Sequence, residues 1–314
     1  MRHIFIVNPA AGHHDTTDAL STEIRQTMEA ENYEIHRTEH PGHARELTGA
    51  LAAQYAPELC RFYACGGDGT LCEVVNGAVG HDNAEVACVP CGTGNDFIKV
   101  FEHRELFRDL NAQVGGQVLS LDVMEVNGRY ALNICNSGLD ARVAHWVHNN
   151  KRKLPFSGIF PYAFSLVLHF FKCINRFYTL EIDGARQEGE YAIIVAANGR
   201  SYGGGFNAVP ESDPDDGKMD VLFIPRISRL TLLRCIGKYA TGRHAELPQL
   251  IHHLHAREIR LLTSTPEPLS TDGEITLETE VCIRLIRGGL RFVQPCGCSI
   301  KHHSSPVAAE NPTA

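Results

Sequence analysis

The residues best suited to chemistry stand where an apolar run ends in Gly66-Gly67-Asp68-Gly69-Thr70 and a helical pattern follows at once. A strand that leads through glycines into a helix suits phosphate, because backbone N–H groups point outward and the helix dipole favours an anion. The Asp68 carboxylate would repel a bare phosphate. It fits if Mg²⁺ lies between them, since Mg²⁺ is usually held by one or two carboxylates plus substrate phosphates. The alternative is a tight turn in which Asp68 only caps the helix, although three glycines exceed what a cap requires.

Two further loops contain residues of the same kind. Asn8-Pro9-Ala10-Ala11-Gly12 follows the first apolar run, and Pro90-Cys91-Gly92-Thr93-Gly94-Asn95-Asp96-Phe97 follows the fourth. In an open parallel sheet such loops lie at the carboxyl edge of the strands, where ligands bind. Either loop alone is a weak signal. Together with the glycine turn they predict one nucleotide-phosphate site with a metal.

Two acidic turns in the second half of the chain could supply further carboxylates. Asp215-Asp216-Gly217 lies in the stretch VPESDPDDGKMDV, and Asp272-Gly273-Glu274 lies in STDGEI. Phosphoryl transfer requires mainly positioning and charge neutralisation, and a carboxylate near the acceptor hydroxyl can take its proton. Glu274 suits that role because Gly273 keeps its turn open. The alternatives are a solvated acidic turn for the first stretch and an ordinary hairpin turn for the second.

The elements that would position these residues alternate in the first third of the chain. The predicted strands are residues 4–7, 33–37, 61–65 and 86–89. The predicted helices are residues 16–30, 43–55 and 70–79. This alternation is typical of a parallel α/β layer. After about Leu121 strands and turns dominate, and Asn127-Gly128 between two apolar runs is the strongest hairpin signal.

The change of pattern predicts two domains. We expect an α/β N-terminal domain with a parallel sheet over residues 1–122 and a C-terminal antiparallel β-sandwich with inserted helices over residues 123–287. Residues 298–314 have little to bury and are predicted to form a flexible tail.

Composition limits the classes of function. A chain of 314 residues with 43% hydrophobic residues can bury the cores of two domains. The net charge of -8 argues against a nucleic-acid partner and against a simple polybasic membrane anchor. The eleven cysteines are scattered through apolar runs, which predicts reduced thiols in a cytoplasmic protein.

One apolar segment tests that interpretation. Residues 154–171 carry no formal charge and are about long enough to cross a bilayer, but Pro155, Gly158 and Pro161 break the first half. The favoured interpretation is a helix that begins near Pro161 and packs against the core. The alternatives are a membrane span and a helix that lines a lipid entry groove.

The order and spacing of these motifs resemble the diacylglycerol kinase catalytic-domain family of lipid kinases, whose soluble bacterial members are the closest in layout. The resemblance rests on NPAAG at 8–12, GGDGT at 66–70, PCGTGNDF at 90–97, the acidic stretch at 209–221 and STDGEI at 270–275. It extends from Asn8 to about Val293, and the motif set is more specific than GGDGT alone, which NAD kinases and phosphofructokinases approximate. The family implies an α/β nucleotide domain and a larger β-sandwich, with a last strand, here near 288–297, that returns to the first domain.

The resemblance also implies roles for individual residues. A structural Mg²⁺ near Asp68 would be held by the Asp216 carboxylate and by the backbone carbonyls of Asp213 and Lys218. Glu274 would be the proton acceptor, with Asp272 as the alternative. The chain departs from the family at Cys72, where asparagine is frequent, and at Asp213 and Lys218. Bound ATP would be held by Asn8, Pro9, Ala10, Ala11, Gly12, Thr38, Gly66, Gly67, Asp68, Gly69, Thr70, Leu71, Cys72 and Thr93.

We therefore predict an ATP-dependent lipid kinase that acts on diacylglycerol or a similar lipid alcohol, with peripheral membrane contact and no nucleic-acid partner. The alternatives are a related kinase with a sphingoid or soluble acceptor such as NAD, and a nucleotide-binding regulator without catalysis. The apolar stretch 156–171 favours a lipid. Both Asp68 and Glu274 count against a mere regulator, because a binder needs no base. The acyl preference, the phosphate donor and the oligomeric state, including a homodimer, stay open.

Overall fold

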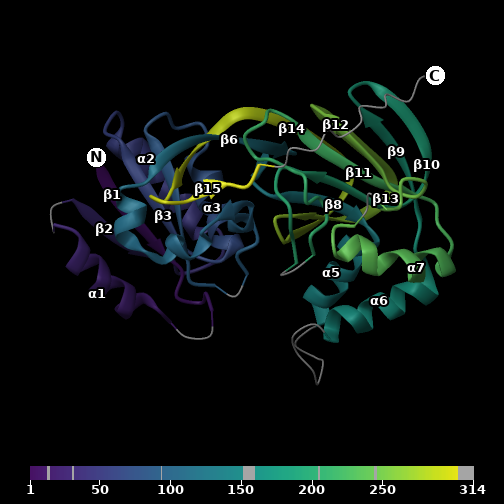
Figure 1. Ribbon diagram of the computed structural model, residues 1–314, viewed down its shortest axis with the longest axis horizontal. Coiled ribbons are helices and arrows are strands. Elements are labelled where there is room, and N and C mark those ends of the chain that lie inside the picture. Colours follow the sequence, from purple (N-terminus) through teal and green to yellow (C-terminus); the bar gives the residue numbers. More distant parts are fainter. Residues whose placement is uncertain are drawn as a thin grey trace.

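The computed structural model describes residues 1–12, 15–29, 32–92, 94–150, 160–203, 206–243 and 246–302. These residues form two lobes that lie side by side (Figure 1). The first lobe contains the N-terminal strands and helices, and the second contains most of the later strands together with three helices that lie along one side of it (Figure 1).

The first lobe is built on parallel strands with helices between them. In the order β4-β3-β1-β2 each neighbouring pair is parallel, as in the register of Phe5 with Ile35 and Tyr63. Every residue of β3 and β4 is buried, which explains their continuous apolar sequence. The elements are β1 (Arg2–Val7), α1 (Thr17–Thr27), β2 (Tyr33–Arg37), α2 (His43–Tyr55), β3 (Cys60–Gly66), α3 (Asp68–Ala78), β4 (Ala84–Pro90), η1 (Phe97–Val100), β5 (Phe101–Glu102), η2 (Arg104–Arg108) and α4 (Leu110–Val114).

The second lobe consists mainly of antiparallel strands. The hairpin predicted at Asn127-Gly128 joins β6 to β7, and both residues have the positive φ that such a turn requires. The elements are β6 (Gln117–Val126), β7 (Arg129–Ala131), β8 (Ile134–Gly138), α5 (Leu139–Asn150), α6 (Phe160–Lys172), β9 (Arg176–Ile182), β10 (Ala185–Ala197), β11 (Met219–Pro225), α7 (Arg229–Ala240), β12 (His252–Ala256), β13 (Glu258–Thr271), β14 (Glu274–Gln294) and β15 (Ser299–Ile300).

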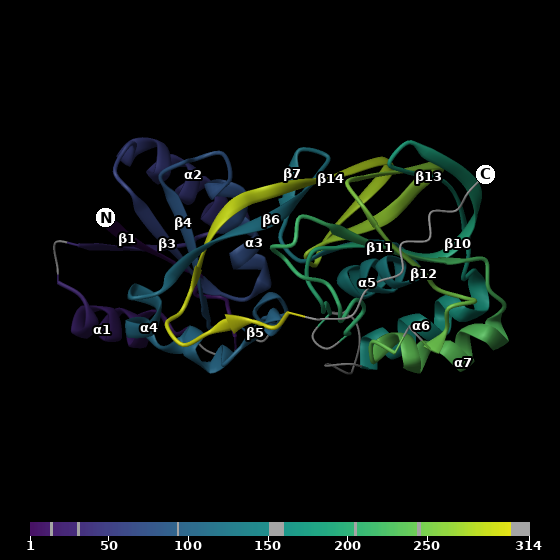
Figure 2. The same cartoon turned by 45° about the horizontal axis from the view of Figure 1, so that its top comes forward.

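Strand β14 belongs to both lobes. It is 21 residues long, pairs antiparallel with β13 and β6, and reaches β4 in parallel at Phe292↔Val86. Figure 2 shows it curving from the second lobe across to the first. The sequence predicts a parallel sheet and an antiparallel sandwich, and the family resemblance implies a last strand near 288–297 that returns to the first domain, as β14 does at Phe292. The described strands instead pair in one 13-stranded sheet that is mostly antiparallel, because β14 joins the two parts.

The chain after Cys298 differs from the predicted flexible tail at its start. Ser299–Ile300 form β15, which pairs with β5, and the side chains of Cys298 and Ile300 are buried in the core of the first lobe. The sequence prediction missed this contact because its partner strand lies about 200 positions earlier in the chain. The predicted tail residues 303–314 lie outside the described part.

The apolar segment forms a short helix. Helix α6 has 13 residues and therefore rises about 20 Å, whereas the hydrocarbon core of a bilayer is about 30 Å thick. Within the described ranges, no helix has the length and apolar character needed to span a membrane. Residues 154–159 of the predicted segment, including Pro155 and Gly158, lie outside the described residues.

Replacing Phe292 tests how firmly β14 is held in the first lobe. Its side chain is fully buried and its ring centroid lies 5.4 Å from that of Phe97 and 5.8 Å from that of Phe101. Phe292→Ala should lower the free energy of unfolding by about 3–5 kcal/mol, measured by urea denaturation. Leu277→Ala on the same strand is the control, because Leu277 is 54% exposed. An equal effect of both substitutions would contradict this account of the core.

Candidate functional site

The three predicted loops meet at the N-terminus of α3. The amide of Asn8 donates to the hydroxyl of Thr70 (3.0 Å), and the Asp68 backbone N–H donates to the carbonyl of Gly94 (3.1 Å). The backbone N–H groups of Cys91 and Gly92 both donate to the carbonyl of Gly66. The structure therefore brings together loops from three separate strand ends, as the sequence predicts.

Glycine is required where these loops touch. A Cβ on Gly92 would lie 2.7 Å from the Gly67 Cα, and one on Gly67 would lie 2.9 Å from the Gly94 carbonyl oxygen. A Cβ on Gly12, which has φ +83°, would lie 2.6 Å from the Cys91 carbonyl oxygen. Gly69 differs, because nothing lies within 4 Å of its Cβ position. This open space over the first turn of α3 fits the close approach of a phosphate group.

The Asp68 carboxylate is fixed in this turn. It accepts hydrogen bonds from the backbone N–H of Asp96, at 2.7 and 2.9 Å, and of Phe97, at 3.3 Å. Burial raises the pKa of Asp68 and the Asp96 charge adds to that rise, while the two backbone donors oppose it. A carboxylate in this position gains from a nearby cation, which fits a bound Mg²⁺.

The glycine turn opens into a large cavity. The cavity has a volume of about 860 Å³ and lies between α3, the β13–β14 turn and the helices α5, α6 and α7. Asp68, Asp96, Asp140 and Asp272 are the carboxylates among the residues that line it. Most of the remaining lining is apolar, including Leu71, Val143, Leu166, Leu232 and Ile251. The cavity can therefore hold a molecule with a long apolar part and place its polar end near Asp68.

Asp272 reaches the same cavity from the second lobe. Asp272 and Gly273 form the two-residue turn between β13 and β14, with φ of +48° and +91°. The Asp272 carboxylate accepts hydrogen bonds from the backbone N–H of Leu132 (2.7 Å), Asn133 (3.1 Å) and Ile134 (2.8 Å). Burial raises the pKa of Asp272 to about 6, although these backbone hydrogen bonds lower it. Asp272 thus fixes the loop 132–134 that forms part of the cavity wall.

Glu274 lies between Gly273 and Ile275, which both line the cavity. Its own side chain is exposed, and its carboxylate is 3.4 Å from the guanidinium of Arg129. Of the two acids in this turn, Asp272 makes the structural contact and Glu274 lies exposed at the surface. The choice of Glu274 as the base stays a prediction.

The other residues predicted to bind ATP lie around the same edge. The Thr38 N–H donates to the Val7 carbonyl (2.9 Å), which puts Thr38 beside the Asn8–Gly12 loop. Ala10 N–H donates to the Asn8 side chain (2.9 Å), so this loop is a tight turn that also contains Pro9 and Ala11. Leu71 and Cys72 line the cavity. Thr93 lies outside the described residues.

The predicted metal residues lie in one loop near the junction of the lobes. Asp213 is buried and its carboxylate pairs with the Arg200 guanidinium. One oxygen of Asp216 accepts the Lys218 N–H (2.9 Å), and the other lies 3.9 Å from the Lys218 ammonium. Asp122 ties the loop to β14 by accepting the N–H groups of Gly217 (2.7 Å) and Gly288 (2.8 Å). Cationic side chains therefore stand beside both carboxylates, and the metal site stays a prediction.

The sequence analysis missed a polar group inside the cavity. Asp140 accepts a hydrogen bond from the Tyr202 hydroxyl (2.7 Å), which lies 3.3 Å from the Tyr239 hydroxyl. Burial raises the pKa of Asp140 to about 6, although the Tyr202 hydrogen bond lowers it. The signal was Gly138-Leu139-Asp140, in which an acid lies two residues after a glycine at a strand-to-helix junction, whereas Asp68 follows Gly67 directly.

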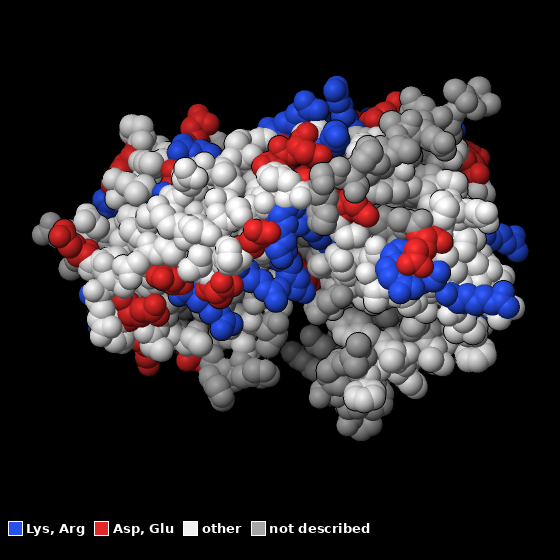
Figure 3. Space-filling view, viewed as in Figure 1, with Lys and Arg blue, Asp and Glu red and all other residues white. Residues whose placement is uncertain are grey.

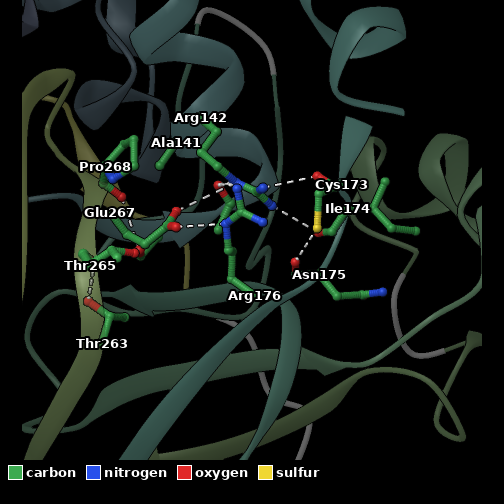
Figure 4. Close-up of polar contacts among 12 residues, drawn as sticks. Ala141, Arg142, Cys173, Ile174, Asn175, Arg176, Thr263, Thr265, Glu267 and Pro268 are labelled. Carbon is green, nitrogen blue, oxygen red and sulfur yellow. Dashed lines mark hydrogen bonds and ion pairs between the residues drawn. The ribbon is translucent and has the colours of Figure 1, made fainter. Parts of the chain in front are cut away.

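A buried ion-pair group holds the helical wall of the cavity (Figure 4). Arg142 of α5 donates to the carbonyls of Cys173 (2.9 Å) and Ile174 (3.0 Å), just after the end of α6. Glu267 of β13 accepts a hydrogen bond from Arg176 (2.7 Å) and lies 3.8 Å from Arg142. Arg142 thereby satisfies carbonyls at a helix end and fixes α6 against α5.

Comparisons with known proteins identify the class. The sequence model for "Diacylglycerol kinase catalytic domain" matches residues 2–126, and the one for "YegS C-terminal NAD kinase beta sandwich-like domain" matches residues 133–294. The chain therefore belongs to the diacylglycerol kinase catalytic-domain family.

Individual relatives agree with this assignment. The protein named "Putative lipid kinase SAR0780" of Staphylococcus aureus (strain MRSA252) is 30% identical over 244 residues, which cover 77% of this chain and 79% of the relative. A "Putative lipid kinase" of Staphylococcus epidermidis is 31% identical over 242 residues, covering 76% and 78%. The fold is similar to that in "Crystal structure of a putative diacylglycerol kinase from Bacillus anthracis str. Sterne", with a TM-score of 0.71, 24% identity and coverage of 94% and 97%.

The raised pKa of Asp140 predicts a pH-dependent stability. The folded pKa of about 6 lies above the ordinary value of 3.8, so the stability linked to this group is complete below 3.8 and is lost as the pH rises through about 6. Asp140→Asn should remove that loss. The melting temperature of the wild type minus that of Asp140→Asn should fall between about pH 4 and about pH 7. The exposed Asp18→Asn is the control. A difference that stays constant across this range would refute the prediction.

Proposed function

We propose that this protein is an ATP-dependent kinase that phosphorylates the hydroxyl group of diacylglycerol or a similar lipid alcohol. The observation that carries the proposal is the glycine turn of α3, which opens directly into an apolar cavity of about 860 Å³. The turn suits a polyphosphate and the cavity suits an acyl chain. A soluble, polar acceptor such as NAD would leave most of the lining without a complementary partner.

Residues of the first lobe would bind the nucleotide. The backbone around Gly69 and the loops 8–12 and 90–96 would hold the phosphates of ATP. A smaller cavity of about 340 Å³ beside Asn95 adds the cationic side chains of Lys99, Arg104 and Arg108. On the face shown in Figure 3, Lys and Arg side chains gather where the two lobes meet. When bound, ATP would supply the γ-phosphoryl group and Mg²⁺ held by Asp68 would offset its charge.

Residues of the second lobe would act on the acceptor. Asp272 fixes the loop 132–134 and the turn, and Glu274 would take the proton of the acceptor hydroxyl. The hydroxyl oxygen would then bond to the γ-phosphorus while the bond from that phosphorus to the bridging oxygen breaks and ADP leaves. The exposed Glu274 can exchange its 3.4 Å contact with Arg129 for one with the acceptor, because a pairing in solvent contributes little. Apolar side chains of α5, α6 and α7 exclude water from the bound lipid.

A sphingoid acceptor is a second candidate. The Asp140 carboxylate and the Tyr202 hydroxyl lie in the cavity and could bind a further amino or hydroxyl group of the acceptor. Diacylglycerol offers ester carbonyls, for which a hydroxyl donor is the complementary group. A sphingoid acceptor would therefore use the Asp140 carboxylate and the Tyr202 hydroxyl, whereas diacylglycerol would use only the hydroxyl as a donor.

The proposed activity is tested by incubating the purified protein with ³²P-labelled ATP, Mg²⁺ and a panel of diacylglycerol, a sphingoid base and NAD. Label should enter the extracted lipid with diacylglycerol, and Asp68→Asn should abolish its incorporation while the circular dichroism spectrum stays unchanged. Label in NAD alone, or activity of Asp68→Asn near that of the wild type, would sink the proposal. Label in the sphingoid base alone would select the second candidate.

Glu274→Gln tests the proposed base. The substitution keeps the shape of the side chain but cannot accept the proton, so turnover should fall by roughly 10²–10⁴-fold with unchanged affinity for ATP. Asp272→Asn is the comparison, because it should lower the melting temperature through the three backbone donors that lose their carboxylate. If Glu274→Gln kept its turnover while a normally stable Asp272→Asn lost it, the roles would be reversed.

We also propose that Asp216, with the carbonyls of Asp213 and Lys218, holds a structural Mg²⁺. A ligand that binds only the folded state raises the melting temperature. Mg²⁺ should therefore raise that of the wild type, and Asp216→Ala should remove the gain. Asp215→Ala is the matched control from the same turn. A gain that persists in Asp216→Ala would exclude this site.

We further propose that the outer face of α6 and α7 contacts a membrane surface when the kinase takes up its lipid. One face of α6 carries a stripe of apolar side chains that are 43–72% exposed, formed by Phe160, Phe164, Val167 and Phe171. Leu233 of α7 is 62% exposed. The opposite side of α6 faces the cavity through Tyr162, Ala163 and Leu166. Arg229 of α7 donates to the carbonyls of Phe170 and Phe171, so the two helices are joined (Figure 1). A helix that is apolar on both sides suits a lipid that passes from a bilayer into the cavity.

Phe171→Ser combined with Leu233→Ser should weaken binding to phosphatidylcholine–diacylglycerol vesicles by roughly tenfold or more, because two apolar side chains no longer leave water. Cosedimentation measures this effect. Leu277→Ser, which changes a 54% exposed side chain on β14, is the control. Equal binding of both variants would rule out this face.

A further inference from the structure

One edge of the second lobe carries polar side chains that the proposed kinase site does not use. Asp220 lies on β11, and His253 and His255 lie on β12. The Nε2 atom of His253 is 2.7 Å, and that of His255 is 3.2 Å, from the same oxygen of Asp220. One ligating atom from each of the three residues lies within 4.8 Å of the other two. These side chains stand outside the lining of the large cavity.

The register of the two strands produces this arrangement. His253 and His255 are two positions apart, so they project from the same face of β12. Asp220 stands directly opposite His255 in the antiparallel ladder. The neighbouring His252 projects to the other face, where its ring stacks on Phe223 with centroids 5.0 Å apart. The grouping therefore follows from backbone pairing as well as from side-chain conformation.

Burial and charge favour a cation at this point. The Asp220 side chain is 5% exposed, that of His253 is 11% exposed and that of His255 is 26% exposed. The carboxylate is thus a buried anion that needs compensating positive charge.

We propose that Asp220, His253 and His255 bind a divalent transition-metal ion of the Zn²⁺ class. Two imidazole nitrogens and one carboxylate oxygen form a common donor set for Zn²⁺, whereas Mg²⁺ prefers oxygen ligands. With metal–ligand bonds of about 2.0–2.1 Å in a tetrahedral site, ligand atoms stand about 3.3 Å apart. The separations of 2.7 and 3.2 Å from the Asp220 oxygen are close to this value, and the two imidazole nitrogens lie within 4.8 Å of each other. Binding replaces the Nε2 protons of the imidazoles and releases them to solvent.

The position of the site suggests what the ion does. Strand β12 is the last strand in the sheet order beyond β11, so it forms an edge of the sheet. It begins directly after Leu250 and Ile251, which line the cavity. An ion shared between β11 and β12 would fix this edge and the adjoining cavity wall. Its effect is on stability and is independent of the proposed kinase activity.

The test uses the full-length protein freed of metal by chelation. Zn²⁺ is added in competition with a chromophoric chelator, and Co²⁺ is added to record its visible absorption. The variants are His253→Ala/His255→Ala and a control that also removes two histidines, His81→Ala/His252→Ala. The wild type and the control should bind one more equivalent of Zn²⁺ than the site variant, show the intense bands of four-coordinate Co²⁺ and melt at a higher temperature with Zn²⁺. Millimolar Mg²⁺ should not compete.

Equal stoichiometry and affinity in the wild type and the site variant would overturn the proposal, as would a Co²⁺ spectrum typical of six water ligands. Asp220→Asn provides the second variant if circular dichroism shows that the double substitution unfolds the protein. This change keeps the side-chain volume but removes the anionic ligand, so Zn²⁺ affinity should fall by roughly 10-fold to 100-fold or more. Unchanged affinity in a folded Asp220→Asn variant would also reject the site.

Discussion

The candidate site depends on β14, a long strand that is shared by the two lobes. One end of β14 forms the Asp272–Glu274 turn at the cavity, and the other end places Phe292 in the core of the first lobe. Strand β14 therefore links the first lobe, which carries the glycine turn of α3, to the acidic turn of the second lobe, although its pairing with β6 is irregular between Ile286 and Leu290. In the first lobe β14 pairs with β6 and, at Phe292, with β4, so both lobes share one sheet.

This constraint explains why carboxylates from distant parts of the sequence share one cavity. Asp68 and Asp272 come from different lobes, and each is held by backbone N–H donors of a neighbouring loop. Their mutual charge contributes to the raised pKa of Asp272, after the larger effect of burial. Two partly buried acids at the polar end of an apolar cavity favour a bound cation, which is the electrostatic demand of phosphoryl transfer.

The sequence predicts the parts of the site that depend on local chemistry. The Gly66–Thr70 turn, the Asn127-Gly128 hairpin and the Asp272-Gly273 turn each follow from residues that are adjacent in the chain. Long-range pairing could not be predicted in the same way. The Arg142–Glu267 contact joins residues 125 positions apart, and the pairing of β15 with β5 joins strands about 200 positions apart. Asp140 was overlooked because its environment depends on Tyr202, which a distant strand end supplies.

The apolar sequence of α6 is compatible both with a membrane span and with a short helix in the wall of the cavity. Helix α6 is apolar on the cavity side and on the outer side, so its hydropathy alone suggests a membrane span. Its 13 residues and the Arg142 contacts after its end define it as a short wall helix. Length and packing, rather than composition, separate these two interpretations.

A crystal structure of the protein with a non-hydrolysable ATP analogue, Mg²⁺ and a short-chain diacylglycerol tests the central claim most directly. Our account predicts that the phosphates lie over Gly69 at the start of α3, that the acyl chains occupy the cavity between α5, α6 and α7, and that the acceptor hydroxyl lies between Asp68 and Glu274. A nucleotide bound away from α3, or a lipid bound outside the cavity, would contradict the claim that the two lobes form one kinase site.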